Sequence, residues 1–266
     1  YTLSLHDALP IFKYLIAGDR SLVVEFGDKI EEQVNSKIRS LTLAMERACI
    51  VGINEIIPTY RSLMVIYDPM IMELDNLIGE IKSIISKMHE LKLPDAKVIE
   101  IPTLYGGEYG PDIEFVANHN KISADEVIKI HTNVEYLIYM IGFTPGFPYL
   151  GGMSDKIEAP RLQNPRTKIP VGSVGIAGKQ TGIYPIESPG GWQLIGRTPV
   201  KLYDPYRDNP VLLNAGDYIK FVQIDENEYK NIEALEREGK YKVITREKLR
   251  RWVYDNNENI KAGYVY

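Results

Sequence analysis

The sequence predicts an α+β protein in which a small α/β domain is followed by a larger domain of short strands that close into a β-barrel. Two observations lead to this prediction. Over residues 13–101, strand-like and helix-like periodicities alternate, whereas residues 142–199 hold 11 of the 21 glycines and 8 of the 16 prolines. Proline removes a backbone donor and glycine has a low helix propensity, so the second window is predicted to form turns and short strands.

The first domain is predicted over residues 13–95. Apolar runs at 14–17 and 22–26 are joined by Gly18-Asp19-Arg20, which predicts a hairpin. Helical periodicity follows from Asp28 to Met45, then two strands at 53–57 and 63–67, and a second helix over 71–85. A last strand at 98–101 completes the order ββαββαβ, which is typical of a ferredoxin-like α/β sandwich.

The second domain is predicted over residues 96–225. Ser123 with Glu126 forms a capping-box pattern that predicts a helix over 123–132, and a buried strand is expected at 136–141. Further strands at 200–203, 211–213 and 218–224 are expected to close the barrel. Residues 226–266 are highly charged with a helical pattern and are predicted to form a surface tail.

The first twelve residues, YTLSLHDALPIF, are set apart from the functional argument. They contain no initiating methionine and no basic segment of the kind that opens a secretion signal. We expect this stretch to be foreign to the gene, with a frayed natural terminus as the alternative.

Composition excludes several classes of function. A net charge of -5 and a pI near 5.5 argue against nucleic acid as the main partner, because that role needs a basic face. The single cysteine, Cys49, leaves no internal disulfide framework and fits a reducing compartment. No apolar run approaches the roughly 18 residues that cross a bilayer, so we predict a cytoplasmic protein without a membrane partner.

The Gly/Pro-rich window is more basic than the rest of the chain. Three acidic residues face six basic ones there: Asp155, Glu158 and Glu187 against Lys156, Arg161, Arg166, Lys168, Lys179 and Arg197. A local charge of +3 beside glycine amides suits a small anion such as a carboxylate or a phosphate. The alternative is a barrel whose turns carry solvated lysines.

Several familiar motifs are absent. Gly172 and Gly178 are separated by five residues and Gln180 follows Lys179, which excludes a Walker phosphate loop. The four histidines and one cysteine have no zinc-site spacing.

His131 is a candidate acid or base, with a hydrogen-bonded structural histidine as the alternative. Trp192 and Tyr184 flank two glycines and are placed either to wall a pocket or to pack in the core.

Longer strings identify a resemblance. The stretches GFTPGFPYLGG (142–152), IPVGSVGIAGKQTGIYP (169–185) and SPGGWQLIGRTP (188–199) closely resemble the allophanate hydrolase subunit 1 family, as do GDRSLVVEFG (18–27) and PTYRSL (58–63). This family includes a 5-oxoprolinase subunit and the sporulation kinase inhibitor KipI. The resemblance extends from about residue 13 to residue 232, which is most of the chain.

The resemblance implies a ferredoxin-like N-terminal domain and a cyclophilin-like β-barrel. It also implies partners: a second allophanate-hydrolase-type subunit (PxpC or KipA) and a LamB/YcsF-type subunit (PxpA). Together these form an ATP-dependent enzyme that opens 5-oxoproline to glutamate, with ATP required at the level of the complex. The alternative function is a KipI-like regulator that inhibits the autophosphorylation of a sensor histidine kinase.

Site roles follow from this implied chemistry. Arg197 or Lys179 is expected to pair with the substrate carboxylate, and backbone amides of the 175–182 loop, including Gly178, to stabilise an oxyanion. The remaining candidates are expected to orient the ring, to shuttle a proton or to line the site: Gln180, Thr181, Tyr184, His131, Arg166 and Trp192. Alternatively, these residues only shape the loop or its interface with a partner.

Overall fold

The computed structural model describes residues 12–87 and 93–248 of the 266-residue chain, so most of the predicted leader lies outside the described residues. The chain divides into two compact units. The first runs to residue 94 and takes in segments 139–142 and 214–216, and the second comprises residues 95–138, 143–213 and the chain from 217 onward.

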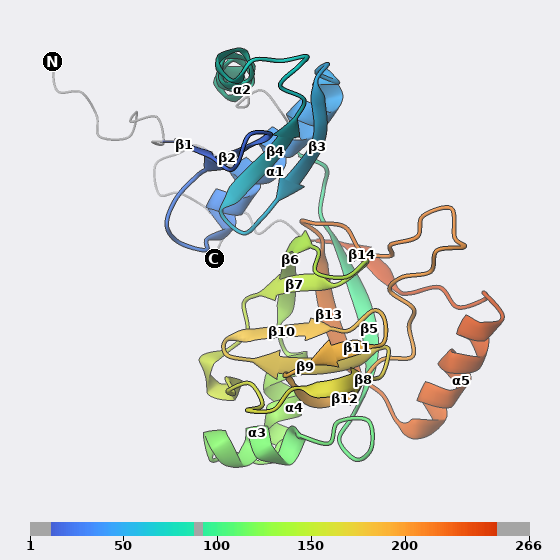
Figure 1. The fold of residues 1–266 in the computed structure, drawn as a ribbon. Helices are drawn as coiled ribbons and strands as arrows, with labels where there is room; N and C mark the ends of the chain where they lie inside the picture. The colour runs from blue at the N-terminus through green and yellow to red at the C-terminus, as the bar shows by residue number, and fades with distance from the viewer. Residues whose placement is uncertain (1–11, 88–92, 249–266) are drawn as a thin grey trace, which may run out of the picture. The chain divides into compact units, whose positions relative to one another are not determined.

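The first unit is a four-stranded antiparallel sheet with two helices. Its elements are β1 (Lys13–Ile16), β2 (Ser21–Glu25), α1 (Glu32–Ala48), β3 (Ile53–Pro58), β4 (Ser62–Tyr67) and α2 (Leu74–Lys87). The strand order is β1-β2-β4-β3, and the chain can be followed by colour in Figure 1. Alternate residues of β2 and β4, such as Leu22 and Leu63, are buried together with Leu41 of α1 and Ile81 of α2. Phe12 packs its ring edge-on against Phe26 at a centroid distance of 4.9 Å.

The strand predicted at 98–101 does not belong to this unit. It forms part of β5 (Lys97–Tyr105), which pairs in parallel with β13 (Tyr218–Gln223) in the second unit. The first unit is therefore ββαββα and not ββαββαβ. Val98 and Ile101 are fully buried, as expected for a strand with neighbours on both sides and covered faces.

The second unit is built on an eight-stranded sheet. Its other elements are α3 (Ile113–Asn120), α4 (Ala124–Thr132), β6 (Glu135–Ile141), β7 (Pro148–Gly151), η2 (Asp155–Ile157), β8 (Arg166–Ile169), β9 (Ser173–Ala177), β10 (Gln180–Ile183), β11 (Ser188–Gly190), β12 (Gln193–Arg197), α5 (Glu226–Arg237) and β14 (Thr245–Glu247). The main path is β10-β9-β12-β5-β13-β6-β7, and its end strands β10 and β7 contact each other. The sheet is thus a nearly closed barrel (Figure 1), with β8 and β11 as a separate pair.

Several predicted elements differ from those observed. The helix predicted over 123–132 is present as α4, with the Ser123 hydroxyl accepting from the Glu126 amide at 3.1 Å, but α3 precedes it. The strands predicted at 200–203 and 211–213 reduce to one bridge between Tyr203 and Val211. The tail is more than a surface appendage, because β14 returns to pair with β5 after α5. No helix within the described ranges is long and apolar enough to cross a membrane.

Candidate functional site

Three of the stretches that carry the family resemblance meet in one aromatic cluster of the second unit. Phe147 precedes β7, Tyr184 follows β10 and Trp192 precedes β12, and all three are buried. The Phe147 ring lies edge-to-face on Tyr184 at 5.6 Å and on Trp192 at 5.7 Å. The structure therefore brings Tyr184 and Trp192 together, and it places them in a packed cluster.

Gly190 is required for this packing. A Cβ atom at Gly190 would lie 2.5 Å from the Tyr184 hydroxyl oxygen and 2.8 Å from Cδ1 of Ile169. Burial raises the pKa of Tyr184 to about 12, although Arg161 and Arg166 act in the opposite direction. The phenol is therefore protonated at neutral pH and is able to donate a hydrogen bond.

Arg166 lies beside this cluster and is held by Asp112. Its Nη2 contacts Asp112 Oδ1 at 2.7 Å, and its Nη1 donates to the Trp192 carbonyl at 3.3 Å. The other Asp112 oxygen accepts from the Leu194 amide at 2.6 Å. Asp112 therefore fixes both the guanidinium and β12. It was not singled out from the sequence, because no local pattern links it to a residue 54 positions away.

A buried hydrogen-bond chain passes through His131. The Tyr105 hydroxyl and His131 Nδ1 are 2.7 Å apart, and His131 Nε2 lies 2.8 Å from the Thr181 hydroxyl. The Thr181 hydroxyl donates to the Gly175 carbonyl at 3.1 Å. Because Thr181 has one proton to give, these contacts assign the Nε2–H tautomer to His131, with Tyr105 donating to Nδ1.

His131 is fully buried, and its ring packs against Phe221 at 4.4 Å. Burial lowers its pKa to about 3, so the ring is neutral at physiological pH. Both ring nitrogens are occupied by Tyr105 and Thr181. The expectation that His131 passes a proton directly to substrate does not fit this placement, which makes it a positioning residue beneath β10. Tyr105 was not singled out from the sequence.

The 175–182 segment is a β-hairpin and not an open loop of free amides. Strands β9 and β10 pair Ala177 with Gln180 across a two-residue turn whose first residue, Gly178, has a φ of 57°. The Gly178 amide donates to the Ala159 carbonyl at 2.7 Å. The Gly178 amide is therefore already hydrogen-bonded, and Gly175 is paired with Gly182 between strands β9 and β10. The oxyanion site expected in this segment is not preformed.

Lys179 and Arg197 do not converge. Lys179 lies at the hairpin tip, and its ammonium contacts Asp155 at 2.8 Å and Glu158 at 3.8 Å. Its hydrogen bond to Asp155, together with the charge of that carboxylate, raises the pKa of Lys179. Arg197 pairs with Ser173 at the other end of β9, and the five residues of that strand span about 13 Å. The predicted shared anion pocket is therefore not formed by these two cations.

Arg197 instead lies among aromatic side chains. Its guanidinium carbon is 5.3 Å from the centre of the Tyr109 ring, and Tyr109 lies 4.8 Å from Tyr229 of α5. Burial raises the pKa of Tyr229 to about 12, against the lowering effect of the Arg197 charge. Arg197 Nε is buried without a hydrogen-bond partner among the described residues. This cation therefore helps to attach α5 to the barrel.

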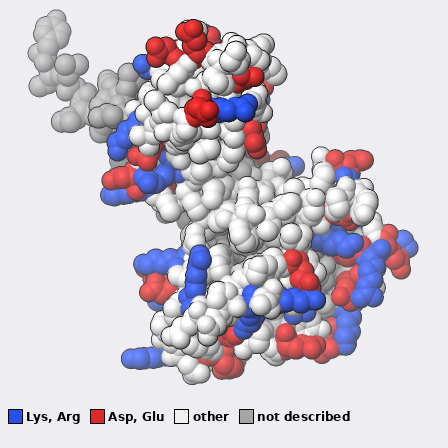
Figure 2. Space-filling model, viewed as in Figure 1, with Lys and Arg blue, Asp and Glu red and all other residues white. Residues whose placement is uncertain are grey.

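Three of the six basic residues of the 142–199 window form ion pairs. Lys168 pairs with Glu187 at 3.0 Å, Lys179 with Asp155, and Arg166 with Asp112 from outside the window. Figure 2 shows basic and acidic side chains interspersed on the visible face of this unit. Within the described residues, no group of three or more His, Cys, Asp or Glu is placed to hold a metal ion.

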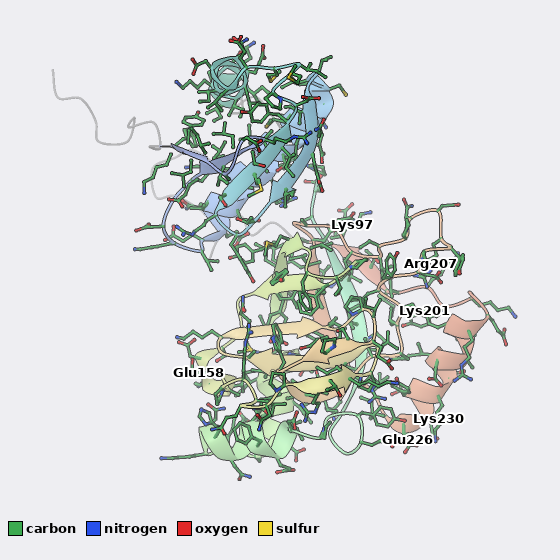
Figure 3. All side chains as sticks on the ribbon, in the orientation of Figure 1. Lys97, Glu158, Lys201, Arg207, Glu226 and Lys230 are labelled. Atoms are coloured by element: carbon green, nitrogen blue, oxygen red, sulfur yellow. The ribbon has the colours of Figure 1, made fainter. Side chains whose placement is uncertain are left out.

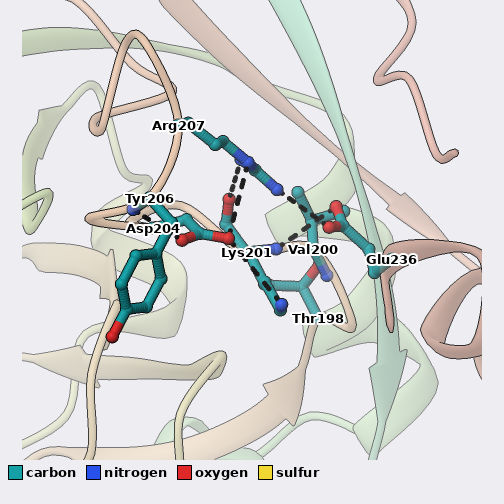
Figure 4. A network of polar contacts seen from close by, with 7 residues as sticks. All are labelled: Thr198, Val200, Lys201, Asp204, Tyr206, Arg207 and Glu236. Carbon is teal, nitrogen blue, oxygen red and sulfur yellow. Dashed lines mark hydrogen bonds and ion pairs between the residues drawn. The ribbon is translucent and has the colours of Figure 1, made fainter. Parts of the chain in front are cut away.

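A second polar network was not predicted from the sequence. Arg207 donates from Nη1 to the Lys201 carbonyl and from Nη2 to Glu236 Oε2, both at 3.0 Å (Figure 4). Glu236 of α5 is only 6% exposed. Lys201 and Arg207 lie on the α5 side of this unit (Figure 3). A cavity of about 280 Å³ adjoins the network and is lined by Arg207, Leu212, Glu236, Gly239, Tyr241, Lys242 and Val243. None of the predicted site residues lines it.

The nearly closed barrel, together with the sequence stretches of the family resemblance that pack in it, defines a carboxyltransferase-type module. The chain belongs to the family described as carboxyltransferase domain, subdomain C and D, whose model matches residues 12–213. It is 46% identical over 222 residues to the B subunit of 5-oxoprolinase from Bacillus subtilis (strain 168), covering 80% of this chain and 92% of that protein. It is 41% identical over 210 residues to the corresponding 5-oxoprolinase subunit of Escherichia coli O157:H7, covering 79% and 94%.

Solved structures show the same fold. The crystal structure of TTHA0988 is 36% identical with a TM-score of 0.69, and the match covers 78% of this chain but only 40% of TTHA0988. The urea amidolyase of K. lactis, at 24% identity, has a TM-score of 0.74, with 90% of this chain and 16% of the amidolyase covered. In both proteins the module is therefore part of a longer polypeptide.

Proposed function

We propose that this chain is the PxpB-type subunit of an ATP-dependent 5-oxoprolinase, which hydrolyses 5-oxo-L-proline to L-glutamate together with partner subunits. The observation that carries the proposal is the 46% identity to the B subunit of a 5-oxoprolinase over 92% of that protein's length. The two units then correspond to a ferredoxin-like domain and a cyclophilin-like barrel. The subunit acts in the cytoplasm.

In this reaction water adds across the lactam C–N bond, which gives a carboxylate and an amine. ATP makes the amide carbonyl reactive enough for attack. The sequence carries no Walker spacing, so we place ATP at the level of the complex, formed with a PxpC-type and a PxpA-type subunit. The chain is not expected to be active alone.

The candidate residues of this chain divide into three groups. Tyr184, Trp192 and Arg166 form one fixed group, which we place nearest the substrate because the strings of the family resemblance meet there. His131 and Thr181 position β10 from beneath. We assign two further positions to contact with the substrate carboxylate or with a partner subunit. One is the hairpin tip, with Gly178, Lys179 and Gln180, and the other is Arg197.

Reconstitution tests the assignment. We expect ATP-dependent release of glutamate from 5-oxo-L-proline when this chain is combined with its two partner subunits, and none when this chain is omitted. Activity of the other two subunits without it would overturn the proposal. Inhibition of a sensor kinase stays a prediction of the family resemblance, and an autophosphorylation assay with the purified chain checks it.

A matched pair of variants then tests the hairpin tip. Lys179 and Lys168 are both exposed lysines of the second unit that pair with a carboxylate, at 2.8 Å and 3.0 Å, and Lys179 has a second, longer contact with Glu158 at 3.8 Å. Lys179→Ala is expected to lower turnover about tenfold, the loss of one ionic contact, whereas Lys168→Ala leaves it unchanged. Equal turnover in both variants would remove Lys179 from the site without affecting the assignment of the subunit.

A further inference from the structure

Arg161, in the loop before β8, carries a charge that no carboxylate offsets within the part of the chain that the structure describes. By contrast, Arg166 pairs with Asp112 at 2.7 Å. Lys168 and Lys179 also have carboxylate partners, at 3.0 Å and 2.8 Å. The side chain of Arg161 is exposed. An exposed arginine forms a binding site only where the surrounding structure fixes it and supplies a second polar group.

The backbone on both sides of Arg161 is fixed to the turn that joins β11 to β12 and to the start of β12. The side-chain amide of Gln193, which is only 2% exposed, donates to the Pro160 carbonyl at 2.9 Å. The Leu162 amide donates to the Gly191 carbonyl at 2.7 Å. Arg161 therefore projects from a short segment that is held at the residue before it and at the residue after it, so its backbone is preorganised.

The same turn brings Arg161 close to the Tyr184 hydroxyl. Gly190, next to Gly191, lies so near this hydroxyl that a Cβ atom there would be 2.5 Å from its oxygen. Burial raises the pKa of Tyr184, and the positive charge of Arg161 acts against that rise. Arg161 and the Tyr184 hydroxyl are therefore electrostatic neighbours, and the glycine keeps any side chain out of the space beside the hydroxyl.

The Tyr184 hydroxyl has a proton to donate. The residue is 2% exposed, and the Trp192 backbone donates a hydrogen bond to the hydroxyl oxygen. Among the residues that the structure describes, none accepts the hydroxyl proton. Buried donors nearly always have an acceptor, because an unmade hydrogen bond costs free energy. The missing acceptor indicates an oxygen atom of a ligand.

We propose that Arg161 and the Tyr184 hydroxyl together bind the carboxylate of the substrate. The guanidinium supplies two parallel N–H donors that match a carboxylate, and the phenol supplies a third donor without adding charge. This inference rests on the proposed function for the identity of the substrate, 5-oxo-L-proline. Lys179 and Arg197 then remain for contact with a partner subunit.

The charge balance of the site favours a carboxylate over a phosphate. Arg161 contributes one positive charge, the phenol is neutral, and the charge of Arg166 is already offset by Asp112. A carboxylate carries a single negative charge, which this arrangement neutralises. A phosphate group carries about −1.5 to −2 at neutral pH and would leave part of its charge unpaired.

Calorimetric titration of 5-oxo-L-proline into the reconstituted complex tests the proposal. Arg161→Ala is expected to weaken binding about thirtyfold, and Arg161→Lys about fivefold, because lysine keeps the charge but not the paired donors. Tyr184→Phe, which removes only the hydroxyl, is expected to weaken binding about fivefold. The matched control is Lys156→Ala, which removes another exposed cation of the 142–199 window that has no ion pair among the described residues and leaves binding unchanged.

A lactam without a carboxylate tests which part of the substrate Arg161 contacts. We expect 2-pyrrolidinone to inhibit the wild-type complex and the Arg161→Ala complex equally, whereas the KM for 5-oxo-L-proline rises about thirtyfold in the variant and kcat changes little. Circular dichroism checks that each variant is folded. Equal losses for both lactams would overturn the proposal, and so would inorganic phosphate that binds at this site more tightly than 5-oxo-L-proline.

The wild-type complex separates this inference from the proposed function. A wild-type complex that neither binds nor hydrolyses 5-oxo-L-proline overturns the proposed function, and this inference with it. An active wild-type complex whose Arg161→Ala variant binds 5-oxo-L-proline normally overturns this inference alone.

Discussion

His131 shows how burial alone can change the role of a residue. An exposed histidine titrates near neutral pH and exchanges protons with solvent, whereas this ring is sealed between Tyr105, Thr181 and Phe221. The ring instead holds strand β10 in place through its contact with Thr181. The same residue type at the same position in the chain, but on the surface, would be a credible acid or base.

The buried ring predicts a pH dependence of stability. The folded pKa of His131, about 3, lies below its unfolded value of 6.5, so the unfolded chain binds an extra proton between these values. This contribution to stability is complete above pH 6.5 and is lost as pH falls toward 3. Between pH 6.5 and 5.5 we expect wild type to lose about 1 kcal/mol more unfolding free energy than His131→Gln, measured by urea denaturation. Parallel pH profiles for the two proteins would contradict this.

Arg207 supplies a second prediction at this scale. It pairs with Glu236, whose side chain is only 5% exposed. Arg207→Ala leaves that carboxylate buried without its ionic partner and is expected to cost about 3 kcal/mol of unfolding free energy. Adding Glu236→Leu removes the stranded charge and should recover part of the loss. A double variant no more stable than Arg207→Ala in thermal denaturation would contradict this explanation.

At the scale of elements, close contacts of backbone explain why some glycines cannot be replaced. A Cβ atom at Gly110, just before α3, would lie 2.0 Å from the Ile195 carbonyl oxygen of β12. That carbonyl is part of the backbone and cannot move aside as a flexible side chain would. The contact holds the loop before α3 against the barrel sheet.

Two glycine-to-alanine variants test this point. Gly110→Ala forces the α3 loop away from β12 and is expected to cost about 2–3 kcal/mol of unfolding free energy. Gly79→Ala, in the interior of α2, meets no atom within 4 Å and should stabilise by about 0.5–1 kcal/mol, because alanine favours the helix. Chemical denaturation measures both. Similar small effects from the two variants would show that the Gly110 contact is dispensable.

At the scale of the whole molecule, net charge governs solubility. The chain has a formal net charge of -5 and a pI near 5.5. As pH falls toward that value, repulsion between molecules disappears while the stability contribution of His131 declines. We expect a solubility minimum near pH 5.5, measured by turbidity. Lys129→Glu removes one positive and adds one negative charge and should move the minimum to lower pH; an unchanged minimum would contradict the charge argument.

Much of the architecture followed from the sequence because it depends on neighbouring residues. Alternating apolar residues in β2 and β4, the helical spacing in α1 and α2, and the Ser123 cap of α4 are local signals. The sequence stretches that carry the family resemblance could be recognised equally well, because each of them is continuous in the chain. The density of glycine and proline likewise indicated short strands and turns in the second unit.

Only the tertiary structure decided which of these pieces meet. It placed β5 and β14 in the barrel sheet, joined Asp112 to Arg166, and set Lys179 and Arg197 at opposite ends of β9. It also buried His131 beneath Thr181. Each of these facts depends on strand register and on packing between distant segments. Periodicity along a chain indicates which way a side chain faces. It carries no information about which distant residue that side chain will contact.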